Sequence, residues 1–290
     1  SLHEIPKRLV VVGAGYIGLE MGTAFSKLGT QVEIVEAGKT ILPLYDKALV
    51  APVAARLKAL GVSVRTEAKV TGVSEDGIVS LEDGTEIPSD YVLVTVGRTA
   101  NTTGFGLEDL ELKMSGRYIS INDRCQTSMT GVYAIGDVTG EPLLAHRAMA
   151  QGEMVAEILA GENRQWDNKV IPAVCFTDPE IVSVGMSPAD AKAAGIDIVE
   201  GQFPFVANGR AMTLERDDGF IRVVARADDH AVIGIQAVGA GFAELASAFV
   251  TAMEMGALVE DVAGIVQAHP TQGEGFQEAA MKALGHALHV

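Results

Sequence analysis

The sequence is short of cysteine and of positive charge. Its two cysteines, Cys125 and Cys175, lie far apart and match no metal-binding or redox spacing, so we expect two buried thiols. The 290 residues include 22 Lys and Arg against 38 Asp and Glu, which gives a net charge of −16. This balance argues against nucleic acid or an anionic membrane as a partner.

The sequence also lacks an uninterrupted apolar run that could cross a membrane. The most apolar region, residues 242–259, is broken by Glu244 and Glu254. Apolar residues nevertheless make up 48% of the chain, enough to bury sizeable cores, and there are no repeats or low-complexity tracts. We therefore expect a cytoplasmic protein with more than one structural unit.

The most informative pattern lies in residues 9–36. An apolar run leads into Gly13, Gly15 and Gly18, which have the spacing G-x-G-x-x-G, and an amphipathic helix should follow. Gly13 allows a tight turn, Gly15 lets a pyrophosphate approach the backbone, and Gly18 permits close packing of the helix on the strand. The helix N-terminus offers unpaired N–H groups to the phosphates. This pattern predicts a dinucleotide site.

A second apolar run in the same stretch ends on Glu36. A carboxylate at this position can accept hydrogen bonds from both adenosine ribose hydroxyls and would repel a 2′-phosphate, which favours NAD over NADP. A glycine triplet alone is also compatible with an ordinary turn between a strand and a helix. The strand, helix, second strand and acid in register favour the dinucleotide interpretation.

The rest of the first hundred residues alternates between helical and extended patterns. The continuous apolar run 91–96 is typical of a strand covered on both faces, and it stops at Gly97. We expect a helix at 46–60 and further strands at 62–65, 68–73 and 78–81. The fold class is therefore α/β, with a β-α-β nucleotide domain and an antiparallel excursion.

The later sequence changes character. We expect a strand running into a glycine junction at 131–138 and a helix at 144–160. From residue 170 on, strands come first and helices afterwards, which indicates an α+β domain with its helices on one face. The expected elements there are helices at 187–195, 242–255, 259–266 and 276–284, and a hairpin formed by 220–226 and 231–238.

Three further groups of residues could carry chemistry. Asp137, at the predicted strand end, could bond a chain of sugar-like hydroxyls, and the helix that starts near Leu144 and Ala145 could bond a ring carbonyl through its N-terminus. The alternative is that Asp137 merely caps a turn. Glu20, on the first helix, reads from its spacing as an exposed helical glutamate.

The third group is centred on His269. Pro270 biases His269 toward an extended conformation, so its ring should project from a loop. A histidine that acts as a base needs an acidic neighbour, and Glu274 is the nearest. The alternative is that Thr271 and Glu274 form a capping box for the last helix. One carboxylate can fill both roles.

Together these motifs resemble a known family. GAGYIGLE, VEIVE, VGR, GVYAIGDV, LLAHRA, FTDPEIVSVG and HPTxxE occur in one order, and they extend over nearly the whole chain. The ordered set resembles the C-terminal two-thirds of the class I pyridine nucleotide–disulfide oxidoreductases, and most of all the dihydrolipoamide dehydrogenases. The resemblance implies a Rossmann-type NAD-binding domain at 1–99, a partial flavin-domain segment at 100–169 and an α+β dimerisation domain at 170–290.

The resemblance also assigns roles to residues. It implies that NAD is held by the glycine turn, Glu36 and Gly97, and that Glu20 lies near the nicotinamide. Asp137 would meet the ribityl chain of FAD, with Leu144 and Ala145 at the pyrimidine side of the flavin.

For the acid–base chemistry, the resemblance implies that His269 and Glu274 serve lipoamide thiols across the interface of a homodimer. The expected activity is NAD-dependent oxidation of dihydrolipoamide, carried by the lipoyl domain of a 2-oxo acid dehydrogenase complex. The related glutathione reductases use NADPH, which Glu36 disfavours.

Members of this family begin with a flavin-binding domain that has its own glycine motif and a C-x₄-C redox disulfide. Residues 1–290 contain neither, and Cys125 and Cys175 match neither the spacing nor the position. We therefore expect this chain, taken alone, to be inactive and not to retain FAD. The remaining alternative is a non-catalytic NAD-binding and dimerisation module.

Overall fold

The computed structural model describes residues 4–290, which form two compact units. One unit combines the chain up to residue 96 with residues 172–290, and the other contains residues 97–171. The first and third predicted domains thus share one compact unit, and the three-domain division stays a prediction.

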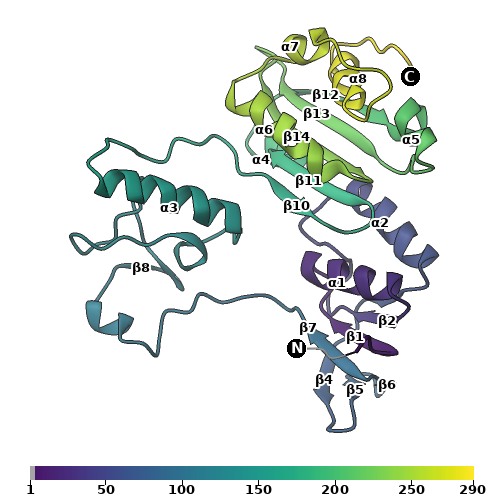
Figure 1. The fold of residues 1–290 in the computed structure, drawn as a ribbon, viewed down its shortest axis with the longest axis vertical. Coiled ribbons are helices and arrows are strands. Elements are labelled where there is room, and N and C mark those ends of the chain that lie inside the picture. Colours follow the sequence, from purple (N-terminus) through teal and green to yellow (C-terminus); the bar gives the residue numbers. More distant parts are fainter. Residues whose placement is uncertain (1–3) are drawn as a thin grey trace. The chain divides into compact units, whose positions relative to one another are not determined.

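The N-terminal part of the first unit is a parallel sheet with strand order β3-β2-β1-β7 (Figure 1). Two helices make the crossovers, α1 between β1 and β2 and α2 between β2 and β3. A separate antiparallel sheet, β4-β5-β6, is inserted before β7. The bounds are β1 Arg8–Val12, α1 Tyr16–Lys27, β2 Gln31–Val35, α2 Lys47–Ala59, β3 Ser63–Arg65, β4 Val70–Val73, β5 Ile78–Leu81, β6 Glu86–Pro88 and β7 Tyr91–Val94. This confirms the predicted β-α-β domain with an antiparallel excursion.

The prediction that the 91–96 strand is covered on both faces is wrong. β7 ends at Val94, and the side chains of Val94 and Val96 are exposed, at 63% and 71%. Among residues 4–290, β7 is an edge strand of the sheet, and β1 is its one partner. A strand with one neighbour leaves part of its surface open whatever its apolar content.

Residues 97–171 hold little regular structure apart from one long helix. The elements are the 3₁₀ helices η1 (Leu107–Leu110) and η2 (Gly136–Thr139), the hairpin β8 (Met114–Ser115) and β9 (Tyr118–Ile119), and α3 (Ala145–Leu159). α3 confirms the predicted helix. The strand predicted at 131–138 does not form, because only a single bridge, between Gln126 and Tyr133, pairs that segment before the chain turns at Gly136.

Residues 172–290 form an antiparallel sheet with strand order β10-β11-β14-β13-β12. Helix α8 packs on β12 and β13, and α6 packs on β11 and β14. The bounds are β10 Ala173–Cys175, β11 Glu180–Gly185, α4 Pro188–Ala193, β12 Ile198–Pro204, η3 Phe205–Ala207, α5 Gly209–Thr213, β13 Phe220–Arg226, β14 Val232–Gly239, η4 Phe242–Leu245, α6 Ala246–Glu254, α7 Val259–Gly264 and α8 Glu274–Ala283. The predicted order of strands and helices is confirmed.

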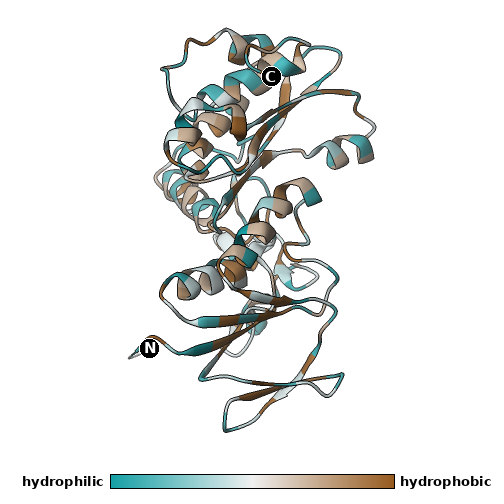
Figure 2. Ribbon diagram, turned by 90° about the vertical axis from the view of Figure 1, so that its right-hand side faces the viewer, coloured by the Kyte–Doolittle hydropathy of each residue, from teal (hydrophilic) through white to brown (hydrophobic). Residues whose placement is uncertain are grey.

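Strand β13, which lies between β14 and the edge strand β12, is buried along nearly its whole length. Successive side chains of β13 point to opposite faces of the sheet, as in any β-strand, and so they enter two different environments. Ile221 lies beside α8, where a Cβ on Gly275 would come within 3.2 Å of its side chain. Phe220 instead joins a core cluster that also contains Leu9 and Ile34 of the nucleotide domain. The two parts of the first unit therefore share one apolar core, and apolar residues follow the strands in Figure 2.

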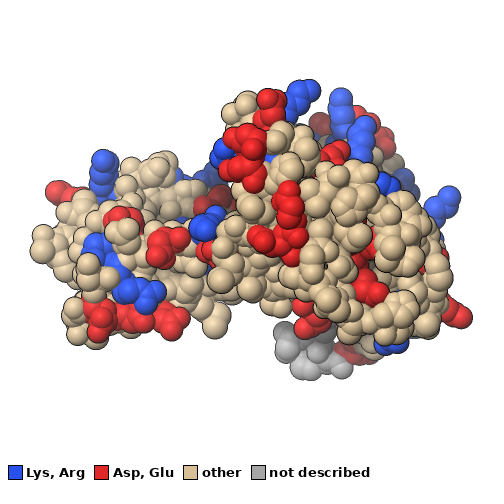
Figure 3. Space-filling view, turned by 90° about the horizontal axis from the view of Figure 1, so that it is seen from above, with Lys and Arg blue, Asp and Glu red and all other residues tan. Residues whose placement is uncertain are grey.

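Acidic residues are spread over the surface rather than gathered in one patch on the face shown in Figure 3, where Lys and Arg lie between them. Within residues 4–290, no helix is both long and apolar enough to span a membrane.

Candidate functional site

The glycine turn has the geometry that close backbone packing requires. Gly13 has φ +103°, and a Cβ there would lie 2.7 Å from the Thr95 carbonyl oxygen. A Cβ on Gly18 would lie 2.1 Å from the Gly13 carbonyl oxygen, so α1 can approach β1 only without a side chain. Gly15 is different, because nothing lies within 4 Å of its Cβ position. The open side of Gly15 is where a ligand could reach the backbone.

Helix α1 begins directly after this open position. Its N-cap is Gly15, which offers no side chain to cap the first N–H groups, and no acidic residue lies in its first turn. Unpaired N–H groups at a helix N-terminus attract phosphate. The turn therefore fits a dinucleotide pyrophosphate, although binding of NAD itself stays a prediction.

Glu36 lies at the end of β2, next to the glycine turn. Its Oε2 accepts a hydrogen bond from the Ala14 N–H at 2.8 Å, and its Oε1 accepts one from the Gly38 N–H at 2.6 Å. These bonds fix the carboxylate beside the turn, in a position suited to ribose hydroxyls. Gly97 follows β7 with φ +122° and belongs to the second unit.

Glu20 is half-buried, not the exposed glutamate that its spacing suggests. Its Oε1 accepts a hydrogen bond from the Phe176 N–H at 2.8 Å, which ties α1 to the segment after β10. Burial raises the pKa of Glu20, and the Phe176 bond opposes that rise. Its predicted place near the nicotinamide is untested.

The predicted flavin-contacting residues lie in the second unit. Asp137 is in η2, and its Oδ2 lies 3.8 Å from Arg98 Nη1. Its place in a 3₁₀ turn and its pairing with Arg98 leave both the flavin role and the turn-capping alternative as predictions. Leu144 is the N-cap of α3 and Ala145 its first residue. Gln151 of α3 holds η2 in place, accepting from the Gly136 N–H at 2.7 Å.

His269 and Glu274 are brought together as the spacing suggests. His269 Nδ1 lies 2.8 Å from Glu274 Oε1, and the His269 side chain is 72% exposed while that of Glu274 is 19% exposed. Burial would raise the pKa of Glu274, but the hydrogen bonds from the Thr271 N–H and from His269 outweigh it and lower that pKa. Nδ1 is engaged by the carboxylate, so the other ring nitrogen, Nε2, is the one that can take a proton.

The capping-box alternative is half right. Glu274 Oε2 accepts from the Thr271 N–H at 2.6 Å, as a capping box requires. The structure does not show the reciprocal bond: the N-cap of α8 is Gly273, with no side-chain cap, and Thr271 Oγ1 donates to the Ala268 carbonyl oxygen at 2.8 Å. Glu274 therefore orients the imidazole and fixes the loop at the same time.

Both thiols are buried, as predicted. Burial raises the pKa of Cys175 to about 11 and also raises that of Cys125. A thiol with a raised pKa is a poor source of thiolate at neutral pH. Cys125 lies outside any strand, with φ +57°.

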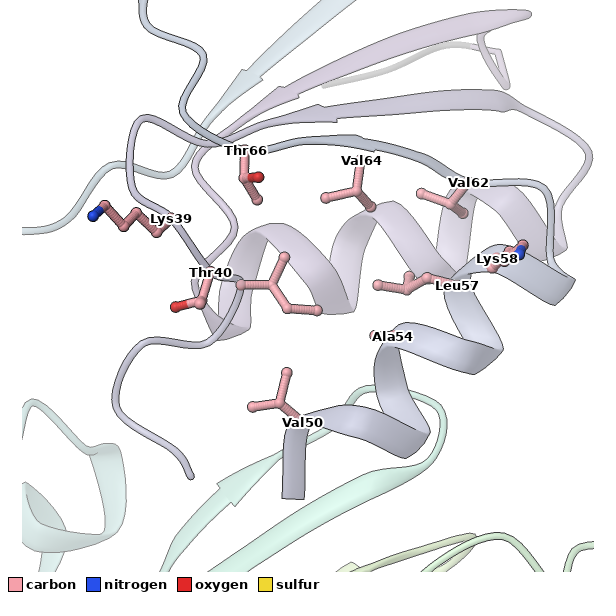
Figure 4. Close-up of a pocket in the computed structure, with 10 residues that line it drawn as sticks. Lys39, Thr40, Val50, Ala54, Leu57, Lys58, Val62, Val64 and Thr66 are labelled. Carbon is pink, nitrogen blue, oxygen red and sulfur yellow. The ribbon is translucent and has the colours of Figure 1, made fainter. Parts of the chain in front are cut away.

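A cavity of about 430 Å³ lies between α2 and β3 (Figure 4). Its lining is mostly aliphatic and contains no acid, histidine or thiol. The residues are Lys39, Thr40, Ile41, Val50, Ala54, Leu57, Lys58, Val62, Val64 and Thr66. It includes none of the predicted site residues.

Comparison with known proteins places the chain in a family. Residues 1–152 match the model of the pyridine nucleotide-disulphide oxidoreductases, and residues 171–280 match the dimerisation domain of the same family. The dihydrolipoyl dehydrogenase of Pseudomonas aeruginosa is 58% identical over 99% of this chain and 62% of its own length. That of Bacillus subtilis is 45% identical over 100% of this chain and 63% of its own length.

Solved structures agree. LpdA from Mycobacterium tuberculosis matches with a TM-score of 0.89 and 29% identity, covering 97% of this chain and 62% of that one. The HOCl-induced flavoprotein disulfide reductase RclA from Escherichia coli matches with a TM-score of 0.88 and 25% identity, covering 97% and 66%. The chain thus spans a little over three-fifths of the length of the dihydrolipoyl dehydrogenases it matches, 62% and 63%. It belongs to the pyridine nucleotide-disulphide oxidoreductase family.

Proposed function

We propose that this chain is the NAD-binding and dimerisation part of a dihydrolipoyl dehydrogenase, which oxidises the dihydrolipoamide of a 2-oxo acid dehydrogenase complex. The observation that supports this proposal most is the contact between His269 Nδ1 and Glu274 Oε1 at 2.8 Å. The imidazole ring of His269 projects from a loop and is open to solvent. The 58% identity to the Pseudomonas aeruginosa enzyme supports the same assignment.

The proposed chemistry of His269 follows from its geometry. Nδ1 donates to Glu274, which fixes the tautomer that leaves Nε2 as the acceptor. Nε2 then takes the proton of a substrate thiol, and the resulting thiolate is the nucleophile in disulfide exchange. Glu274 stabilises the imidazolium that forms, and its lowered pKa keeps it ionised for this task.

The cofactors have matching residues in this chain. The open backbone at Gly15 and the carboxylate of Glu36 would hold NAD, and Asp137 with Leu144 and Ala145 would form one edge of an FAD site. When bound, FAD and NAD supply the electron and hydride transfer. The family match to a dimerisation domain supports a homodimer, in which residues 171–280 would form the interface.

The test of the proposed base is His269→Gln in the flavoprotein that contains these residues. Oxidation of dihydrolipoamide by NAD should fall by roughly 10²–10⁴-fold, the usual contribution of a positioned general base. NADH oxidation by a one-electron acceptor should be largely spared, because that route bypasses the thiol.

The matched control is His230→Gln. His230 also directs Nδ1 at a glutamate, Glu260, but it lies in the turn before β14 rather than in the loop before α8. This variant should keep both activities. An equal loss of both activities in His269→Gln would give the loop a folding or dimerisation role, and full activity would leave Glu274 as a helix-start residue only.

A further inference from the structure

Asn208 lies immediately before α5 and is 3% exposed. Both the oxygen and the nitrogen of its side-chain amide form hydrogen bonds. Oδ1 accepts from the Ala211 N–H at 2.9 Å and so caps α5, while Nδ2 donates to the Thr271 carbonyl oxygen at 3.0 Å. This orientation of the amide is required, since a backbone N–H can only donate and a carbonyl oxygen can only accept.

Thr271 is thereby held through both of its backbone groups. Its N–H donates to Glu274 Oε2 at 2.6 Å, and its carbonyl oxygen accepts from Asn208. Since Glu274 uses its other oxygen for His269 Nδ1, Asn208 is connected to the imidazole through two successive hydrogen-bonded residues. Without the Asn208 donor, the Thr271 carbonyl would lose this hydrogen bond, and the loop would no longer be fixed at this point.

The neighbours of Asn208 also lie close to this loop and to the start of α8. Phe205 is fully buried, and a Cβ on Gly275 would lie 2.6 Å from its ring, so Phe205 packs against the first turn of α8 beside Glu274. A Cβ on Gly209 would lie 3.8 Å from His269 Cε1. Residues 205–209 therefore lie close to His269 and to Gly275, the residue that follows Glu274.

This segment is itself firmly anchored. The Phe205 N–H donates to the Gly219 carbonyl oxygen at 2.9 Å, and its ring packs edge-on against Phe242, with the centroids 4.5 Å apart. Beyond α5, Arg216 forms ion pairs with Asp178 and Asp218. Asn208 thus projects from a fixed support into a loop that is otherwise exposed.

We propose that Asn208 is a positioning residue for the His269–Glu274 pair: its Nδ2 donor fixes the Thr271 carbonyl and thereby the loop that presents the imidazole. The inference rests on the proposed function only for its consequence in catalysis. Asn208 touches neither thiol nor cofactor and acts through Thr271 and Glu274.

The test is Asn208→Ser, with Asn208→Thr as a second variant that fills more of the vacated space. Serine and threonine can still cap α5, but they are too short to reach Thr271. The readout is the tautomer of His269, measured by ¹⁵N NMR at a pH where the ring is neutral. Both variants keep Glu274 and also keep His289, an ionisable group whose charge acts on Glu274.

The parent chain should show the Nδ1–H tautomer, because Glu274 accepts that proton. Both variants should lose that signal and resemble Glu274→Ala, whose side chain has no oxygen to accept the Nδ1 proton. Thr213→Gly weakens α5 at an exposed position without touching Asn208, and it should keep the parent spectrum.

Folded Asn208 variants with the parent tautomer would overturn the proposal. Failure of both variants to fold would make Asn208 a folding residue and would overturn it equally. Neither outcome bears on whether His269 is the base, which the turnover of His269→Gln decides separately.

Discussion

Asp178 concentrates more charge contacts than any predicted site residue. Its carboxylate pairs with Lys27 of α1 at 2.8 Å, with Arg56 of α2 at 3.2 Å and with Arg216, while its own side chain is only 9% exposed. Burial works to raise the pKa of Asp178, but the three cations outweigh it and lower that pKa from the ordinary 3.8 to about 2. Because the folded pKa is lowered, the stabilisation is complete above the ordinary value and is lost as the pH falls toward about 2.

Asp178→Asn should therefore lower the free energy of unfolding by about 1–3 kcal/mol at neutral pH, since it leaves the three cations without their carboxylate. Urea unfolding at a series of pH values measures this difference, which should shrink as the pH falls from the ordinary pKa of 3.8 toward about 2. Asp228→Asn is the control, because Asp228 also has a pKa of about 2 but is fully exposed. A constant difference at all pH values, or an equal effect of both variants, would contradict the ion-pair explanation.

At the residue scale, the sequence reveals sites whose parts lie close together in the chain. Spacing predicts the glycine turn and identifies Glu274 as the nearest acid to His269, but it leaves open whether Glu274 pairs with His269 or caps the last helix. Asp178 and Asn208 could not be predicted in this way, because their partners Lys27 and Thr271 are distant in sequence and meet only through tertiary packing. An asparagine before a glycine suggests a turn, and nothing local indicates that its amide holds another loop.

At the scale of elements, the turn between β1 and α1 contains one glycine that the packing requires and another that ligand binding requires. Gly15 has an ordinary φ of −73° and open space at its Cβ position, whereas a Cβ on Gly18 would collide with the Gly13 carbonyl oxygen. The two glycines therefore serve different purposes, although the motif treats them alike.

Gly15→Ala should keep the parent melting temperature and weaken NADH binding, because its methyl group occupies the space that the pyrophosphate needs. Gly18→Ala should lower both the melting temperature and NADH affinity, since α1 must move away from β1. Thermal melts and calorimetric titration of the two variants distinguish the roles. If Gly15→Ala binds NADH as tightly as the parent chain, the pyrophosphate does not contact the backbone at Gly15.

Element prediction succeeded where local signals agree and failed where pairing decides. Helix α2 falls within the predicted range 46–60, and it begins after Asp46, whose Oδ1 accepts from the Ala48 and Leu49 N–H groups. The apolar sequence of β7 does not indicate that the strand lies at the edge of the sheet. The segment at 131–138 has strand-like composition but finds only one bridging partner. Both outcomes depend on neighbours that composition does not specify.

At the scale of the molecule, the nucleotide domain and residues 172–290 are joined by polar ties as well as by a common core. Arg222, 8% exposed on β13, pairs with the α2 N-cap Asp46, and Glu20 accepts from the Phe176 N–H. Together with the three cations around Asp178, these contacts fix α1 and α2 against the antiparallel sheet. This explains why the two parts form one compact unit although their folds were predicted as separate domains.

The most direct test of the account is calorimetric titration of the chain with NADH and with NADPH, since dinucleotide selectivity depends on a single fixed carboxylate. NADH should bind clearly more tightly, because Glu36 accepts ribose hydroxyls and repels a 2′-phosphate. Glu36→Gln removes the negative charge and should reduce the difference in affinity between NADH and NADPH. Equal affinities for NADH and NADPH in the parent chain, or no binding of either, would contradict the assignment of residues 4–96 as an NAD site.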